Sequence, residues 1–415
     1  MSTTLIHARR ALTPSSEIKD AGILIREGVI EAIGPRSSMS LPSGALEIHA
    51  TDKTAVPGFL DIHIHGAGGH DVMEASSAAL GAVTGKVAGF GTTSLLATTV
   101  TASPDDTCRA VGGIAKYITQ QHASPDPRAE VLGIHFEGPF ISKERRGVHP
   151  TQWIQSPSAE LLDRFLQAAA GNARLMTIAP EVLGAAPCIE AAKKAGLVIS
   201  MGHTDANYEQ ARFAISRGVR NATHMYNAMR PFSHRDPGVI GAVLTSPEIN
   251  AELIADGVHV EEGAMKLLLQ AKGAERVILV SDGLSATGMP DGKYMLGDFE
   301  VIVSNGVCRN AAGILAGSTL TLDRALRNIV NLGIPLPDAV RMLTLNPASL
   351  LGIEFKKGSC QRVCAFRIHC VTGFRPIVNH CPYRPRFLDS DCHIGYPPQF
   401  DRETAFIGIS GRLLT

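Results

Sequence analysis

Side chains that can bind a metal ion or transfer a proton stand at the ends of five short apolar runs. The runs read AVPGFLDIHIHG, EVLGIHFEGP, GLVISMGHTD, VRNATHMYNAM and RVILVSDGLSA. In chain order they supply His63 with His65, then Glu137, His203, His224 and Asp282. Histidine and carboxylate ligands suit zinc or another divalent cation, and a catalytic site leaves one position open for water. The set predicts a shared catalytic metal site.

Each of these residues also has an ordinary structural interpretation. Because side chains alternate along a strand, His63 and His65 share one face and could simply be polar edge residues. Glu137 could be a loop charge or a helix cap, and Asp282 could be a helix N-cap. A single histidine at the end of a strand could be a hydrogen-bonded structural residue. The metal site is favoured because the same placement recurs five times.

The elements that would position these side chains follow from the same apolar runs. A parallel strand buried on both faces reads as a continuous apolar run, and the chemistry of a (β/α)8 barrel gathers where its strands end. From residue 56 onward strand and helix patterns alternate, which favours a parallel sheet closed into a barrel. The expected helices span residues 76–88, 104–121, 158–170, 186–195, 208–217, 261–271, 319–332 and 338–345. We therefore predict an α/β fold, a (β/α)8 TIM-type barrel.

Three regions are expected along the chain. Residues 1–56 read as short strands, with Glu27 and Gly28 at a tight turn, and should form most of a small β-sandwich. Residues 57–358 should form the metal-dependent hydrolase barrel. Residues 359–415 are an atypical tail that we expect to be poorly ordered.

Length, composition and charge restrict the classes of function. A chain of 415 residues accommodates one barrel of about 250 residues and a small accessory domain. The formal net charge is zero, which gives no electrostatic reason to expect nucleic acid or an anionic membrane as a partner. The start MSTTLIHARR lacks the apolar core of a signal peptide, and no apolar run approaches the ~18 residues of a membrane span. We expect a soluble, cytoplasmic protein.

Several ordered motifs carry a resemblance to a known family. They are PGFLDIHIHG, GIHFEGPFIS with RGVHP, MGHTDA, THMYNAMRPFSHRDPG, ADGVH, SDGLSATG and LAGSTLTLDRA. Over residues 5 to 358 the chain resembles the N-acetylglucosamine-6-phosphate deacetylases, a branch of the amidohydrolase superfamily. The resemblance implies a metal held by Glu137, His203 and His224, with Asp282 as the general base and acid. It also implies that His63 and His65 can hold a second metal.

The same resemblance implies a reaction, a cofactor and a partner. The reaction is hydrolysis of the acetamide of N-acetylglucosamine 6-phosphate to glucosamine 6-phosphate and acetate. The metal is expected to be Zn²⁺, one or two ions per subunit, with Fe²⁺, Mn²⁺ or Co²⁺ as alternatives. The enzyme is expected to be a homodimer in which Arg235 reaches the neighbouring subunit's site, since an Arg fork suits phosphate. The implied substrate-binding residues are Val148, His149, Asn227, Ala228, Arg235, His259, Leu315, Ala316 and Gly317.

Two other functions stay open at this stage. Another amidohydrolase activity, such as cyclic-amide hydrolysis or deamination, would use the same metal site but would not require Arg235, His149 or the YNAM segment. An inactive or binding-only remnant would follow if the altered tail prevented folding.

The tail departs from the family pattern after residue 358. It contains Cys360, Cys364, Cys370, Cys381 and Cys392 together with frequent prolines. The cysteines lack the paired C-x2-C spacing of zinc knuckles, so a zinc-binding appendix is disfavoured. A reading-frame change explains the abrupt loss of pattern better. We then expect the N-terminal strands to lack a partner.

Overall fold

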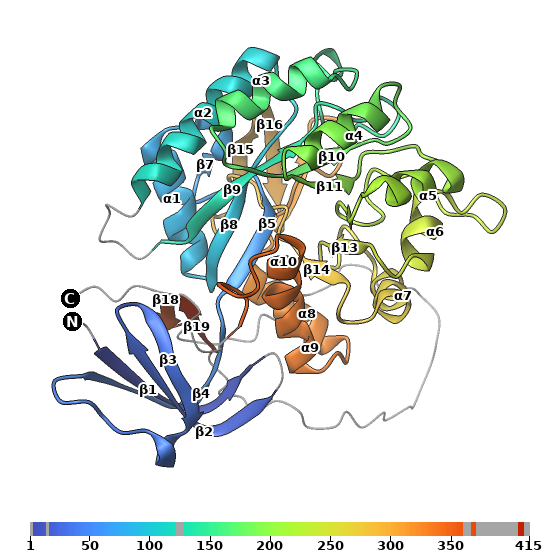
Figure 1. Ribbon diagram of the computed structural model, residues 1–415. Coiled ribbons are helices and arrows are strands. Elements are labelled where there is room, and N and C mark those ends of the chain that lie inside the picture. Colours follow the sequence, from blue (N-terminus) through green and yellow to red (C-terminus); the bar gives the residue numbers. More distant parts are fainter. Residues whose placement is uncertain (1–2, 14–15, 122–127, 360–366, 371–405, 411–415) are drawn as a thin grey trace.

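The computed structural model describes residues 3–13, 16–121, 128–359, 367–370 and 406–410 (Figure 1). It contains a barrel domain and, at one end of the barrel, a small sheet formed mainly by the N-terminal strands (Figure 1).

Eight strands of the barrel domain lie side by side in the order in which they occur in the chain. Their neighbours pair in parallel. The strands are β5 (Phe59–Ile64), β8 (Thr92–Thr99), β9 (Glu130–Glu137), β10 (Ala173–Ile178), β11 (Val198–Met201), β12 (Asn221–Ala222), β13 (Asn250–Leu253) and β14 (Val277–Leu279). A parallel bridge from Ile64 to Gly283 joins the segment after the last strand to the first strand. The sheet is thereby nearly closed, which confirms the predicted barrel.

Helices follow the successive barrel strands and cover the outside of the sheet (Figure 1). They are α1 (Ser77–Ala88), α2 (Pro104–Gln120), α3 (Ala159–Ala169), α4 (Ala185–Lys194), α5 (Tyr208–Arg217), α6 (Gly238–Thr245), α7 (Glu262–Lys272) and α8 (Leu322–Asn331), and the chain continues into α9 (Leu336–Leu343) and α10 (Leu345–Leu350). Short 3-10 turns are η1 (Arg36–Ser38), η2 (Val72–Glu74) and η4 (Thr151–Trp153). Within the described ranges, no helix is both long and apolar enough to cross a membrane.

Local sequence explains where several helices begin and end. Ser76 caps α1 by accepting a hydrogen bond from the backbone N–H of Ala79. Asn207 and Gln210 form a reciprocal capping box at the start of α5, and Gly218 ends that helix with a φ of 110°. The sequence interpretation did not include α6. That helix, GVIGAVLT, is almost wholly buried and apolar, so it shows no amphipathic stripe.

Two small antiparallel sheets interrupt the alternation of strands and helices in the barrel. One is inserted between the last barrel strand and α8 and consists of β15 (Gly292–Leu296), β16 (Phe299–Ser304) and β17 (Val307–Asn310). The other pairs β6 (Gly66–Ala67) with β7 (His70–Asp71) directly after the first barrel strand. Both follow barrel strands at the end where the predicted site residues lie.

The small domain is a six-stranded sheet in the order β18-β19-β4-β1-β2-β3. Its strands are β1 (Thr3–Leu12), β2 (Glu17–Arg26), β3 (Val29–Pro35), β4 (Leu46–Pro57), β18 (Arg367–Cys370) and β19 (Phe406–Ser410). Glu27 and Gly28 have φ values of 51° and 74°, as a two-residue hairpin with the right-handed sheet twist requires. Isoleucine and alanine side chains form the apolar core of this sheet.

The tail contributes to this sheet in its described part. Strand β19 pairs in parallel with β4, and β18 pairs with β19. The edge of β4 that the sequence predicted to be unpaired therefore has a neighbour along Thr54–Pro57. The tail positions from 360 to 366, 371 to 405 and 411 to 415 lie outside the described residues, and with them most of the cysteines considered for a zinc appendix. The three domain boundaries stay a prediction.

Candidate active site

The predicted metal ligands converge at the carboxyl ends of the barrel strands. His63 lies within β5, and Glu137 is the last residue of β9. His203, His224 and Asp282 each follow the end of a strand by two or three residues. Backbone hydrogen bonds fix the position of Asp282: its N–H donates to the carbonyl of His63 (2.9 Å), and its own carbonyl accepts from the N–H of Ser318 (2.8 Å). The barrel closure thus brings the last predicted residue beside the first.

The Glu137 carboxylate lies at the centre of five imidazole rings. Its Oε1 is 3.0 Å from Nε2 of His224, 3.2 Å from Nε2 of His203 and 3.3 Å from Nε2 of His63. Its Oε2 is 3.2 Å from Nε2 of His65 and 3.4 Å from Nε2 of His149. All six side chains are buried. A buried carboxylate surrounded by imidazole nitrogens lowers the stability of the fold unless a positive charge neutralises it.

Asp282 faces the same group of side chains and lies beside His63 and His65. Its Oδ1 is 3.3 Å from Nε2 of His65 and 3.6 Å from Nε2 of His63. Its backbone φ is 49°, and those of His203 and His224 are 47° and 28°. Non-glycine residues rarely adopt this left-handed region, and such strain clusters at functional sites. The fold therefore holds the backbone of these three residues in a conformation that non-glycine residues disfavour.

The protonation pattern around His203 fits a bound cation. Its Nδ1 donates to the carbonyl of Arg145 (2.9 Å), so Nε2 carries a lone pair. Burial, assisted by His149, lowers the pKa of His203 to about 4 and keeps the ring neutral. Its Nε2 lies 3.1 Å from Nε2 of His224 and 3.2 Å from Oε1 of Glu137. A lone pair that faces a second imidazole nitrogen and a carboxylate oxygen at these distances is suited to binding a divalent metal.

The pair His63 and His65 is anchored in the same way. Nδ1 of His65 donates to the carbonyl of Thr98 (3.0 Å), and Nδ1 of His63 donates to Glu252 (2.9 Å). Burial opposes a positive charge on His65, but hydrogen bonds to Asp282 and to Glu137 outweigh it and raise its pKa to about 9. The surrounding carboxylates thus attract positive charge to this position.

The donor atoms fall into two groups of three, each with its atoms within 4.8 Å of one another: His63, His65 and Asp282, and Glu137, His149 and His203.

His149 differs from the other imidazoles in its tautomer. Its Nδ1 accepts a hydrogen bond from the backbone N–H of Thr101 (3.2 Å), so the ring proton is on Nε2. That N–H points to Oε2 of Glu137. A protonated Nε2 donates a hydrogen bond but cannot bind a metal. We therefore take His224, rather than His149, as the third ligand beside Glu137 and His203, although Nδ1 of His224 has no hydrogen-bond partner among the described residues.

A cavity of about 210 Å³ opens over these side chains. Its lining includes His65, Glu137, Val148, His149, His203, His224, Asn227, Ala228, His259, Asp282, Leu315 and Gly317, all of which the sequence proposed. It also includes Val100, Gly147, Leu296 and Ile314, which the sequence did not propose. An adjoining hollow of about 290 Å³ shares Val100 with this cavity. Its described lining has none of the proposed site residues, so the chemistry belongs to the smaller cavity.

Three proposed residues lie outside the lining of this cavity. His63 is fully buried beneath it, where its Nε2 faces Glu137 and Asp282. Ala316 packs into the apolar cluster under the inserted sheet. Arg235 is exposed on the segment between β12 and α6.

Two residues of the cavity lining, His259 and Gly317, depend on a particular neighbour or backbone conformation. Nδ1 of His259 lies 2.7 Å from Oδ2 of Asp256. Burial opposes charging of His259, but the hydrogen bond to Asp256 outweighs it and raises the pKa of the imidazole. Gly317 has a φ of 55°, and a Cβ there would lie 3.1 Å from the carbonyl oxygen of Asp282. Glycine permits both this backbone conformation and this close approach.

Sequence reasoning missed two buried carboxylates behind the ligands. Asp61 accepts backbone N–H bonds from His63 and Ser281, and burial raises its pKa to about 6. Glu252 bonds the ring of His63. Each is the single acidic residue of a short strand that is buried throughout, FLDIHI and NAEL. An isolated charge in a strand that should be buried is a signal that could have found them.

The fold and the site together define a class of protein: a (β/α)8 barrel with a histidine and carboxylate site for a metal where its strands end. The profile of the Amidohydrolase family matches residues 54–361. The chain therefore belongs to the amidohydrolase family, which is metal-dependent.

Individual relatives narrow this class. An N-acetylglucosamine-6-phosphate deacetylase of Vibrio furnissii is 37% identical over 360 residues, covering 85% of this chain and 87% of the relative. An N-acetylgalactosamine-6-phosphate deacetylase of Escherichia coli O157:H7 is also 37% identical, covering 86% and 92%. A solved structure of an N-acetyl-D-glucosamine-6-phosphate deacetylase mutant from Mycobacterium smegmatis, in complex with N-acetyl-D-glucosamine-6-phosphate, superposes with a TM-score of 0.81 at 34% identity, covering 88% and 94%.

Proposed function

We propose that this chain hydrolyses the acetamide of N-acetylglucosamine 6-phosphate to glucosamine 6-phosphate and acetate. The observation that carries the proposal is one cavity in which Glu137, His203 and His224 converge and Asp282 faces them. Relatives named for this deacetylation match the chain over most of its length.

Two metal positions are assigned to the chain's residues. Glu137, His203 and His224 would hold the first ion. His63, His65 and Asp282 would hold a second. Zn²⁺ is the proposed metal because imidazole and carboxylate ligands suit it, with Fe²⁺, Mn²⁺ or Co²⁺ as the alternatives. When bound, such an ion lowers the pKa of water towards neutrality and polarises the amide carbonyl.

Asp282 moves the proton in the proposed reaction. The pKa of this carboxyl is low, about 2, because the hydrogen bond from His65 and the charge of His63 outweigh the effect of burial. Asp282 is therefore ionised and can take the proton from the attacking water as a new C–O bond forms at the acetamide carbon. It then passes that proton to the amine nitrogen as the C–N bond breaks. One carboxylate thus serves as general base and then as general acid.

Recognition of the sugar phosphate is proposed for the cavity wall and a second subunit. His149, whose Nε2–H faces Glu137, lines the cavity and is assigned to the substrate. Substrate contacts are further assigned to Val148, Asn227, Ala228, His259, Leu315, Ala316 and Gly317. Arg235 is exposed outside its own cavity, so we assign it to the phosphate in the site of a second copy, which makes the enzyme a homodimer. The proposed compartment is the cytoplasm.

A second substrate has its own support. The relative from Escherichia coli O157:H7 is named for N-acetylgalactosamine 6-phosphate, and it matches this chain as closely as the Vibrio furnissii relative does. The two sugars differ only in the configuration of one ring hydroxyl. The acetamide and the phosphate, on which the proposed contacts act, are shared by both.

The test is acetate release from both sugar phosphates and from unphosphorylated N-acetylglucosamine. We expect turnover of N-acetylglucosamine 6-phosphate to exceed that of the other two substrates, to stop after chelation and to return on addition of Zn²⁺. A higher kcat/KM for the galacto sugar would reassign the substrate. A folded, metal-loaded protein that releases no acetate from either phosphate would overturn the deacetylase proposal.

A further inference from the structure

Glu252 is a fully buried carboxylate that the proposed reaction does not use. It lies on β13, and its exposed fraction is 0%. It does not belong to the lining of the cavity. A carboxylate in such a place is strongly destabilising unless hydrogen bonds satisfy it. Its contacts should therefore reveal a reason for its presence.

Three donors meet this carboxylate: one from β5, one from β12 and one from the segment directly after β12. Its Oε2 accepts from Nδ1 of His63 (2.9 Å) and from the backbone N–H of His224 (3.2 Å). Its Oε1 accepts from Nδ2 of Asn221 (2.6 Å). The carboxylate thus links the first barrel strand to the segment that carries His224. Each of the three atoms that face it is a donor, which suits an acceptor-only group.

The hydrogen bond to His63 decides what the other side of that ring can do. With the proton on Nδ1, the lone pair of Nε2 points towards Oε1 of Glu137 (3.3 Å) and Oδ1 of Asp282 (3.6 Å). Nε2 of His63 is buried and has no hydrogen-bond partner in the part of the chain that the structure describes. A buried nitrogen lone pair that faces two carboxylates is arranged to bind a cation between them. A carboxylate behind a ligating histidine commonly fixes its tautomer and orientation.

We propose that Glu252 is a positioning residue that holds His63 ready to bind the second metal ion and so sets the occupancy of the position formed by His63, His65 and Asp282. This inference rests on the proposed metal hydrolase function. Glu252 meets the first position only through the backbone N–H of His224. Its loss should therefore weaken the second ion more than the first.

The decisive variant is Glu252→Gln, measured by metal binding rather than by activity. The amide keeps the shape, but it replaces one acceptor oxygen with an NH₂ donor that would face a donor. Metal-free protein is titrated with Zn²⁺ against a competing chelator, and bound zinc is counted by elemental analysis. We expect two ions per subunit in the parent chain. In the variant, we expect the second ion to bind about 10- to 100-fold more weakly and the first to be retained.

Asp71→Asn is the matched control. Asp71 is also a buried carboxylate that accepts backbone N–H bonds, but its partners are Met73 and Gly297 rather than a metal ligand. This change should lower thermal stability and leave both zinc affinities as they are. If Glu252→Gln does not fold, Glu252→Asp carries the test, because it keeps the charge and shortens the reach. A second-ion affinity between those of the parent chain and the Gln variant is expected for it.

The outcomes separate this inference from the proposed function. Unchanged affinities for both ions in a folded Glu252 variant would overturn the positioning role, and so would a parent chain that binds one ion at every zinc concentration. Equal weakening of both ions would show a structural role and would also overturn it. Zinc binding that follows the expected pattern in a protein without deacetylase activity would support Glu252 and refute only the proposed reaction.

Discussion

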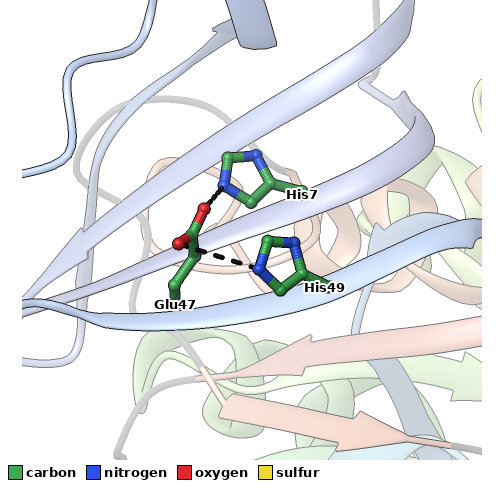
Figure 2. A group of neighbouring side chains, drawn as sticks. All are labelled: His7, Glu47 and His49. Atoms are coloured by element: carbon green, nitrogen blue, oxygen red, sulfur yellow. Dashed lines mark hydrogen bonds and ion pairs between the residues drawn. The ribbon is translucent and has the colours of Figure 1, made fainter.

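Two groups of histidine and carboxylate side chains in this molecule contain the same residue types but differ in burial and in how their rings are anchored. One surrounds Glu137 in the barrel. The other consists of His7 on β1 with Glu47 and His49 on β4, and Figure 2 shows both rings turning a nitrogen towards the carboxylate. The parallel register places His7 opposite His49, and their rings stack with centroids 5.2 Å apart.

The surroundings separate the two groups. In the small sheet the Glu47 and His49 side chains are 33% and 58% exposed, so water solvates them. Nδ1 of His7 is buried without a partner among the described residues, whereas Nδ1 of His63 donates to Glu252. Exposed ion pairs contribute only about 0–1 kcal/mol. We therefore interpret the small-sheet group as a partly exposed contact between His7, Glu47 and His49 rather than a metal site. The comparison shows that burial of all the ligands and anchored rings, rather than residue types alone, favour a metal site.

The largest effect should come from Glu137→Gln, which removes the carboxylate at the centre of the barrel group. Bound metal and activity should fall together, and activity by more than the ~10⁴-fold that loss of a single acid–base group costs. Elemental analysis and the acetate assay measure both quantities on one preparation. If the variant kept its full metal content, another carboxylate would have to take the place of Glu137 in the ligand set.

Asp282→Asn should remove most of the catalytic activity while the first metal ion stays bound. The amide keeps the shape but cannot accept and return a proton, so kcat should fall by about 10²–10⁴-fold. The ion at Glu137, His203 and His224 should be retained. The control is circular dichroism, which should match that of the parent chain. Loss of all metal with normal turnover of the reloaded protein would contradict the proton-transfer role.

Arg235→Ala should have a smaller effect that depends on the substrate. Loss of a charge-assisted hydrogen bond to phosphate costs about 1.5–3 kcal/mol, or roughly 10- to 150-fold in kcat/KM. Turnover of an unphosphorylated acetamido sugar should change little. An equal loss on both substrates would make Arg235 a structural residue.

Mixing two impaired chains tests where this arginine acts. In a mixed dimer of Arg235→Ala and Asp282→Asn chains, one of the two sites would receive both intact groups if Arg235 reaches across the interface. Activity should then rise above that of either variant alone. No recovery in verified mixed dimers would place Arg235 in its own subunit's site or outside both.

The smallest effect should come from His49→Ala in the small-sheet group. Removing one partner of an exposed ion pair should change the free energy of unfolding by about 1 kcal/mol or less. Zinc stoichiometry and kcat should equal those of the parent chain. A variant that lost one equivalent of zinc would show that the small sheet holds a metal and would break the comparison.

Much of the barrel could be predicted because its signals are local. Apolar runs marked the strands that carry or precede His63, Glu137 and Asp282, and helical patterns marked α1 and α5, whose caps the structure then showed. Helix α6 was missed because a buried, wholly apolar helix has no stripe. The pairing of β4 with β19 joins segments about 350 residues apart, and no local pattern could show it.

By itself, the sequence determined which side chains are available and at which strand ends they stand, because apolar runs and chain order are properties of the chain alone. Only the tertiary structure decided which groups each of these side chains contacts. The N–H of Thr101 makes His149 a hydrogen-bond donor, and Glu252 leaves Nε2 of His63 free for a cation. Those partners lie 48 and 189 residues away along the chain. A histidine's tautomer depends on what faces each nitrogen in space, and only the closed barrel brings those groups together.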